Sequence, residues 1–190
     1  MEQPKSEIMS VPSGAAAAAN KTIYNKMLIT RKIPLNITNV GNNILTMLKN
    51  VAVNHLEGIC VVEGYVRPGS VSIQNYSSGE LFGSKVLFDV VIECDVCYPV
   101  EGMEIECVAK NITKAGIRAE IQNKNDEPTP VIVFLARDHH TSGYFTSVKL
   151  NDKINVRVIG QRFELNDKYV SVIAELIEPD VIKKPKLRIA

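Results

Sequence analysis

The chain has 190 residues, 45% of them apolar and 23% charged, with a formal net charge of +1 at pH 7. This composition is ordinary for a globular protein, and so small a net charge means that any contact with nucleic acid must come from a local patch. No apolar run approaches the roughly 18–20 residues that cross a bilayer, and the N-terminus lacks the basic start of a signal peptide. We therefore expect no secretion and no membrane partner, and four cysteines that are free thiols in a reducing compartment.

The first predicted elements are a tail, a strand and a helix. Residues 1–21 mix Pro, Ser, Gly and Ala without periodicity, which predicts a disordered tail. A strand is predicted over residues 26–35, and the helix that follows is capped by Thr38 or Asn39 and ends before Gly58. The apolar stripe of this helix, with its histidine as a core or boundary residue, comprises Ile44, Leu45, Leu48, Val51, Ala52, His55 and Leu56.

Strands dominate the rest of the N-terminal half. Residues 58–66 and 70–76 are predicted as two strands joined by a turn at Arg67-Pro68-Gly69, and residues 77–84 as an exposed loop. Residues 85–97 alternate strictly between apolar and polar side chains, which predicts a long strand. Its apolar face comprises Val86, Phe88, Val90, Ile92, Cys94 and Val96, and its polar face comprises Lys85, Asp89, Glu93 and Asp95.

Cys94 and Cys97 form a C-x-x-C pair, which could be half of a zinc site, a redox pair, or two residues of a strand. Residues three apart in a continuous strand point to opposite faces, whereas a zinc half-site needs its two thiolates to converge. No second C-x-x-C pair accompanies this one, and nothing helical follows it, as a redox pair would require. The pattern favours strand cysteines, and we expect neither a metal nor a cofactor.

Five strands are predicted in the C-terminal half, over residues 103–112, 114–122, 131–137, 152–160 and 168–178. A long excursion, residues 138–147, separates the third from the fourth. This arrangement is typical of a small closed barrel of the OB type, so the predicted fold class is α+β, with a helix and antiparallel sheet followed by the barrel. Alternation places inward the side chains of Met103, Ile105, Cys107, Ala109, Ile117, Ala119 and Ile121.

Four stretches together resemble a known family. They are VEGMEIECVAKNITKAGIRAEI (100–121), LEGICVVEGYV (56–66), VIVFLARDHH (131–140) and LNDKINVRVIGQRFELNDKYVSVIAEL (150–176). In order and spacing they are similar to the stalk subunit of DNA-directed RNA polymerase, which is the seventh subunit of the eukaryotic enzyme and the E subunit of the archaeal one. The resemblance covers roughly residues 26–178.

The resemblance implies different functions for the two halves of the chain. Residues 22–98 would form a tip domain that docks on the polymerase core, and residues 99–180 an S1-type OB barrel that contacts nascent single-stranded RNA. Residues 93–104 would be the hinge between them, and residues 181–190 a basic tail. The expected partners are other polymerase subunits, including a small helical stalk partner. Docking is expected to involve Tyr76, Gly79, Leu81 and Phe82.

The sequence also departs from the family. The loop at 76–84 lacks the fuller Gly/Pro-rich form, and Ile117 and Arg118 stand where the second barrel strand of S1 domains often carries an aromatic residue. Such divergence would suit the polymerase of a large DNA virus. The expected location is accordingly the site of transcription: nucleus or cytoplasm, or for a virus the viral factory or virion.

Candidate RNA-contacting residues are cations for phosphates and flat side chains for bases. Arg118 and Arg157 are expected to point outward by alternation, and Phe134 is either a core residue or a stacking platform. The full set is Lys110, Lys114, Arg118, Phe134, Arg137, Arg157 and Arg162, for each of which an ordinary solvated surface position is the alternative.

No catalytic motif is present, so we expect an accessory subunit without an active site of its own. Asp138-His139-His140 could suggest a general base or a metal site, but adjacent histidines on a loop diverge. A second functional hypothesis stays open, a free-standing S1-type single-stranded RNA-binding protein of translation or RNA decay.

Overall fold

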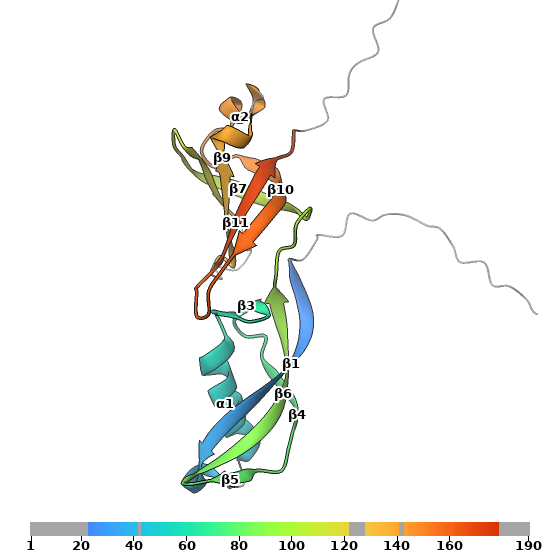
Figure 1. Ribbon diagram of the computed structural model, residues 1–190, viewed down its shortest axis with the longest axis vertical. Coiled ribbons are helices and arrows are strands. Elements are labelled where there is room, and N and C mark those ends of the chain that lie inside the picture. Colours follow the sequence, from blue (N-terminus) through green and yellow to red (C-terminus); the bar gives the residue numbers. More distant parts are fainter. Residues whose placement is uncertain (1–22, 42, 122–127, 141–142, 179–190) are drawn as a thin grey trace, which may run out of the picture.

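The computed structural model describes residues 23–41, 43–121, 128–140 and 143–178, and it confirms the α+β class. An antiparallel sheet with one helix lies at one end of an elongated molecule, and a closed β-barrel lies at the other (Figure 1). The predicted tails, residues 1–21 and 181–190, fall outside the described residues.

Two long strands form the backbone of the N-terminal sheet. β1 (Tyr24–Asn36) and β6 (Lys85–Cys97) pair antiparallel along their whole length, from Tyr24 opposite Cys97 to Asn36 opposite Lys85. The predicted alternation of β6 is confirmed, because its apolar face is buried at every second residue. Pro34 is tolerated within β1 because this strand lies at the edge of the sheet, where a missing N–H costs no ladder hydrogen bond.

Helix α1 (Ile44–Leu56) buries a narrower stripe than the sequence predicts, made of Leu48, Ala52 and Leu56. The predicted core or boundary position of His55 is wrong, because the helical rotation from buried Leu56 turns it into solvent, and Leu45 is 51% exposed.

The predicted helix start is also wrong. Residues Ile37–Asn39 form a 3₁₀ turn, η1, and the residue that precedes the helix is Asn43. The Ile37 N–H donates a hydrogen bond to the Ser84 carbonyl at 3.2 Å, which holds this part of the chain on the sheet and delays the helix.

Two segments between α1 and β6 differ from prediction. Residues 58–66 are not one strand but a tight hairpin, β2 (Cys60–Val61) and β3 (Gly64–Val66). Gly64 has φ +128°, and a Cβ there would lie 2.6 Å from the Cys97 carbonyl oxygen, so this close turn requires glycine. Strand β4 (Ser72–Tyr76) is as expected, whereas the predicted loop at 77–84 contains a short strand, β5 (Glu80–Phe82), that pairs with β6.

Five strands close the barrel in the order β10-β11-β9-β8-β7, as the prediction of an OB-type barrel requires. β9 and β11 pair parallel, and the other pairs are antiparallel. The excursion at 138–147 contains turn η2 (Arg137–His139) and a short helix, α2 (Gly143–Ser147). The strands are β7 (Glu104–Ile112), β8 (Gly116–Glu120), β9 (Val131–Ala136), β10 (Lys153–Arg162) and β11 (Val170–Leu176).

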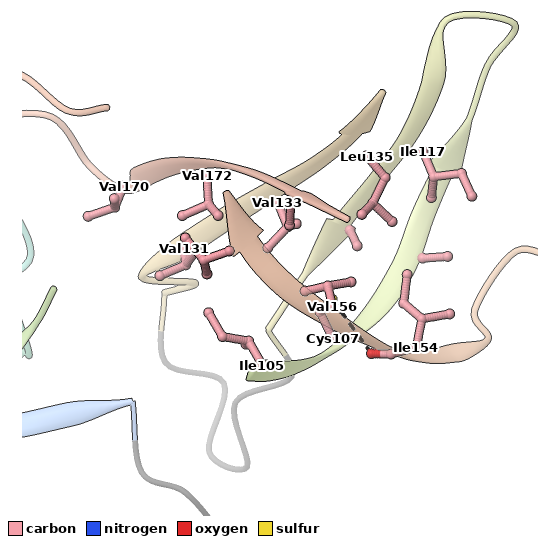
Figure 2. Packing of buried hydrophobic residues seen from close by; sticks show 14 of the residues in the cluster. Ile105, Cys107, Ile117, Val131, Val133, Leu135, Ile154, Val156, Val170 and Val172 are labelled. Atoms are coloured by element: carbon pink, nitrogen blue, oxygen red, sulfur yellow. Dashed lines mark hydrogen bonds between the residues drawn. The ribbon is translucent and has the colours of Figure 1, made fainter. Parts of the chain in front are cut away.

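Branched and small side chains fill the barrel interior, among them Ile117, Val133, Leu135 and Val156, each fully buried (Figure 2). The predicted inward face of β7 and β8 is confirmed for Ile105, Cys107, Ala109, Ile117 and Ala119, while Met103 and Ile121 are half-buried at the margin.

The two halves meet through packed side chains and backbone hydrogen bonds. Cys60, Tyr65 and Cys97 belong to the N-terminal sheet, yet they pack in the same buried cluster as the barrel interior, whereas Cys94 lies in the cluster beneath α1. The prediction that Cys94 and Cys97 face opposite ways is therefore confirmed. In addition, the Cys60 N–H donates to the Asp167 carbonyl at 2.7 Å, and the Asn166 N–H donates to the Cys60 carbonyl at 2.9 Å.

Candidate nucleic-acid interface

A groove of about 450 Å³ crosses the outer face of the barrel. Strands β8, β9, β10 and β11 all contribute to it, so its shape depends on barrel closure. Its lining is mostly apolar, with two aromatic rings and two arginines, and comprises Arg118, Ile132, Phe134, Gly160, Gln161, Arg162, Tyr169, Ser171, Val172 and Ile173.

Strand register places these side chains in rows across the barrel. Arg118 lies opposite Phe134, Phe134 opposite Ile173, and Ile173 opposite Gly160. A second row joins Ile132, Ser171 and Arg162 through the same pairs. A cation on β8 is thus the direct cross-strand neighbour of an aromatic ring on β9.

Phe134 points out of the barrel, so its core interpretation is wrong. Its two neighbours on β9, Val133 and Leu135, are fully buried, whereas Phe134 is 40% exposed. A Cβ added at Gly116 would collide with the Leu135 carbonyl oxygen and lie 3.2 Å from the Phe134 ring, so glycine here lets β8 and β9 approach and also leaves space for the ring. The ring is therefore held as a flat, accessible surface of the kind on which bases stack.

Both charged side chains of the groove lining are arginines, which favours an anionic ligand. Arg118 pairs with Glu120 at 3.2 Å, and Arg162 pairs with Glu164 at 3.1 Å. Exposed ion pairs of this kind contribute only about 0–1 kcal/mol. A phosphate can therefore compete for either guanidinium at small cost.

Arg137, Lys114 and Lys110 are exposed but do not line the groove. The Arg137 N–H donates to the Ala115 carbonyl at 3.0 Å, which places Arg137 beside the β7–β8 bend that carries Lys114. The Arg137 guanidinium also lies over the Phe145 ring, 5.7 Å from its centre. Arg137 and Lys114 therefore lie together beyond the C-terminal end of β9, whereas Lys110 lies within β7.

Arg157 is placed apart from the groove. It pairs with Glu175 at 2.9 Å and with Glu104 at 3.5 Å, while Lys153 on the same strand pairs with Glu106 at 3.2 Å. This charge ladder runs across β7, β10 and β11, and both of its cations form ion pairs with glutamates on the neighbouring strands. Alternation placed Arg157 outward correctly, but it could not show that acidic neighbours would flank it.

Of the two adjacent histidines, His140 has a structural role. The His140 ring accepts a hydrogen bond at Nε2 from the Leu176 N–H (2.7 Å), so its proton lies on Nδ1, which donates to the Ala136 carbonyl (2.7 Å). The same ring stacks on Phe145 at 4.6 Å. His139 is exposed, and no group of three potential metal ligands occurs among the described residues.

All four cysteines are free and buried. Burial raises the pKa of Cys60 and Cys94 to about 11 and that of Cys97 and Cys107 to about 12. These thiols are therefore protonated near neutral pH, unlike the thiolates that bind metals or attack disulfides.

The residues expected to dock on a polymerase lie at the far end of the N-terminal sheet. Leu81 and Phe82 on β5 are each 73% exposed, and Tyr76 is 38% exposed with its ring edge-on to Phe88 at 6.3 Å. Gly79 has a structural task, because a Cβ there would lie 2.9 Å from the Phe88 ring. Ile37, bonded to Ser84 close by and 52% exposed, extends this surface.

Sequence reasoning missed seven of the ten residues that line the groove, among them the large exposed or half-buried side chains of Ile132, Tyr169 and Ile173. The available signal was alternation along β11, where Val170, Val172 and Ala174 are buried while residues 169, 171 and 173 are not. Because the segment is apolar at almost every position, its two faces look alike until the barrel is closed.

Neither of the α-helices in the described residues has the length and apolar character needed to span a membrane. No family model matches the chain. It is 28% identical over 110 residues to a protein of Acanthamoeba polyphaga mimivirus whose name begins "Putative DNA-directed RNA polymerase subunit". The alignment covers 51% of this chain and 52% of the viral protein, so the chain spans about half the length of this curated relative.

Proposed function

We propose that the chain is a non-catalytic stalk subunit of a multisubunit DNA-directed RNA polymerase, which contacts nascent single-stranded RNA through its S1-type barrel. The observation that carries the RNA contact is the row of Arg118, Phe134 and Ile173 in a groove whose charged side chains are both cationic. The polymerase assignment is supported by the name of the viral relative and by the order of the family-like segments.

In this proposal the two ends of the molecule have different partners. The apolar surface of Ile37, Leu81 and Phe82 docks on other polymerase subunits, because exposed apolar side chains that gather in one patch, unlike single ones, mark an interaction surface. Residues 22–98 form the docking domain and residues 99–180 the RNA-facing one, and a small helical subunit completes the stalk. The protein then works at the site of transcription, in nucleus or cytoplasm, or in a viral factory or virion.

The docking half of the proposal is tested by co-purification. Tagged full-length chain is expected to bring down the large polymerase subunits, and the double variant Leu81→Ser/Phe82→Ser should lose most of them. Leu150→Ser is the matched control, since Leu150 is 58% exposed on the barrel. Retention of the large subunits by the Leu81/Phe82 variant would place docking elsewhere, and their absence with the wild-type chain would refute the stalk assignment.

The RNA half is tested by two charge reversals of equal size. Arg118→Glu/Arg162→Glu alters the groove, and Lys153→Glu/Arg157→Glu alters the charge ladder. For single-stranded RNA, the groove variant should bind more weakly, and its salt slope should fall by about 0.7 for each phosphate that the protein no longer neutralises. Equally weakened binding in the two variants would mean that general charge, and not the groove, binds the RNA.

The second hypothesis, a free-standing single-stranded RNA-binding protein, shares the same groove. It differs at the other end of the molecule, because it requires no partner for Leu81 and Phe82. A monodisperse monomer that binds RNA but never co-purifies with polymerase subunits would favour it over the stalk.

A further inference from the structure

We propose that the groove holds a run of about three stacked bases, enclosed at its two ends by the rings of Phe134 and Tyr169. The inference rests on the proposed RNA-binding function. It adds Tyr169 as an RNA-contacting residue, and it defines the length and the sequence tolerance of the bound segment.

The two rings stand at opposite ends of the groove. Both line it, and they are exposed to nearly the same extent, 40% for Phe134 and 42% for Tyr169. Phe134 lies opposite Ile173 in the parallel pair of β9 and β11, and Tyr169 precedes Ile173 on the chain by four residues. The Val170 N–H donates to the Pro130 carbonyl at 2.8 Å, so the alignment with β9 continues to the start of β11.

The separation of the rings sets the length of the stack. Four residues of a strand span about 13 Å at about 3.3 Å per residue. Stacked bases repeat at about 3.4 Å, so two rings this far apart leave room for about three bases between them.

The floor of the groove is mostly apolar. Ile132 and Ser171 form it in the row between the rings, and Ile173 and Gly160 continue it in the row of Phe134. Nothing lies within 4 Å of the position a Cβ on Gly160 would take. Stacking on rings and on an apolar floor is tolerant of sequence, because every base has a π-face. Arg118 on β8 and Arg162 on β10 flank this floor from opposite sides and can meet the phosphates.

The experiment measures binding of oligouridylates of one to eight nucleotides to the full-length protein. Affinity should rise steeply up to the trinucleotide and more slowly beyond it. Tyr169→Ala and Phe134→Ala should each lower the affinity for the trinucleotide about tenfold, as the loss of one stacking surface does. Each should change the affinity for the dinucleotide by no more than about twofold, because two bases can stack on the ring that remains. Tyr169→Phe should bind like the wild type.

Tyr98→Ala is the control, since Tyr98 is also 42% exposed but lies outside the groove, edge-on to Phe163. If RNA binds but Tyr169→Ala and Tyr98→Ala behave alike, the enclosed stack is refuted while the RNA-binding function stands. If length dependence shows no change at three nucleotides, the stack is likewise refuted. If no oligonucleotide binds, or an acidic peptide occupies the groove instead, the proposed RNA function itself fails.

Discussion

The barrel and the N-terminal sheet expose apolar side chains for different reasons. Barrel closure removes free strand edges, so the exposed Phe134 and Ile173 cannot be explained as the margin of an unfinished sheet. The sheet stays open, with β1 at its edge and α1 packed on one face, and its most exposed apolar residues, Leu81 and Phe82, lie at its far end. In the proposed function, the exposed side chains of the barrel groove bind a ligand, and those of the sheet are covered by a partner.

The junction limits how separate these regions are. Tyr65 is fully buried and comes from the hairpin of the N-terminal sheet, but it packs with the barrel interior. The sheet therefore completes the barrel core at the end nearest to it. We expect the two regions to unfold together.

Alkaline pH should produce the largest effect, and it bears more on the barrel than on the sheet. Three buried thiols, Cys60, Cys97 and Cys107, lie in the barrel cluster and one, Cys94, lies beneath α1. Because each folded-state pKa is raised above 9.0, the unfolded chain loses these protons first. Stability is unaffected by the thiols below pH 9 and falls as pH rises towards 11, by several kcal/mol in total.

The measurement is the free energy of unfolding in denaturant between pH 8 and pH 11. Cys107→Ala and Cys94→Ala each remove one buried thiol, one from each cluster. In each variant, the free energy of unfolding should fall less between pH 8 and pH 11 than it does in the wild type. A fall unchanged by both substitutions would mean that other groups, such as tyrosines, cause it.

Leu48→Ala tests whether the sheet and the barrel unfold together. Leu48 is fully buried beneath the N-terminal sheet, so the substitution should cost about 3 kcal/mol. If unfolding is shared, the slowest-exchanging amides of β9 in the barrel should exchange faster by the same free energy, even though β9 lies in the other cluster.

Leu45→Ala is the matched control, because Leu45 is on the same helix but 51% exposed, and it should change stability by less than about 0.5 kcal/mol. The measurement is hydrogen exchange resolved by residue. Faster exchange confined to the N-terminal sheet would show two independent units.

The sequence predicts the regular parts of both regions well. Alternation located β6 residue by residue, since every second side chain from Val86 to Val96 is buried. It failed at β2 and β3, where two two-to-three-residue strands are set by the turn at Gly64 and not by periodicity. It also failed at Leu45, because an apolar residue at helical spacing shows a possible face but not how wide a surface covers it.

The candidate interface was predicted in part. Arg118 and Arg162 line the groove with Phe134, whereas Arg157 lies in the charge ladder. No local pattern distinguishes these arginines, because what separates them is the neighbour across the barrel: Phe134 for Arg118, and Glu104 with Glu175 for Arg157. Cross-strand neighbours depend on the order in which the strands pair in the closed barrel. The alternation of apolar and polar residues within one strand does not predict that order.

His140 supplies the smallest of these tests, at the barrel end far from the sheet. Its ring joins the end of β9 to β11 through the Ala136 carbonyl and the Leu176 N–H, and it stacks on Phe145. His140→Ala would leave both backbone groups without this partner, so we expect a loss of about 2 kcal/mol. His139→Ala, at the exposed neighbouring position, should cost less than about 0.5 kcal/mol. Chemical denaturation of both variants at pH 8 measures the difference, and equal losses would show that His140 does not hold the strand ends together.

If the sheet and the barrel unfold together, His140→Ala should also speed hydrogen exchange at the slowest-exchanging amides of β6. Its loss of stability in the barrel would then be transmitted to the sheet through the packing of Tyr65.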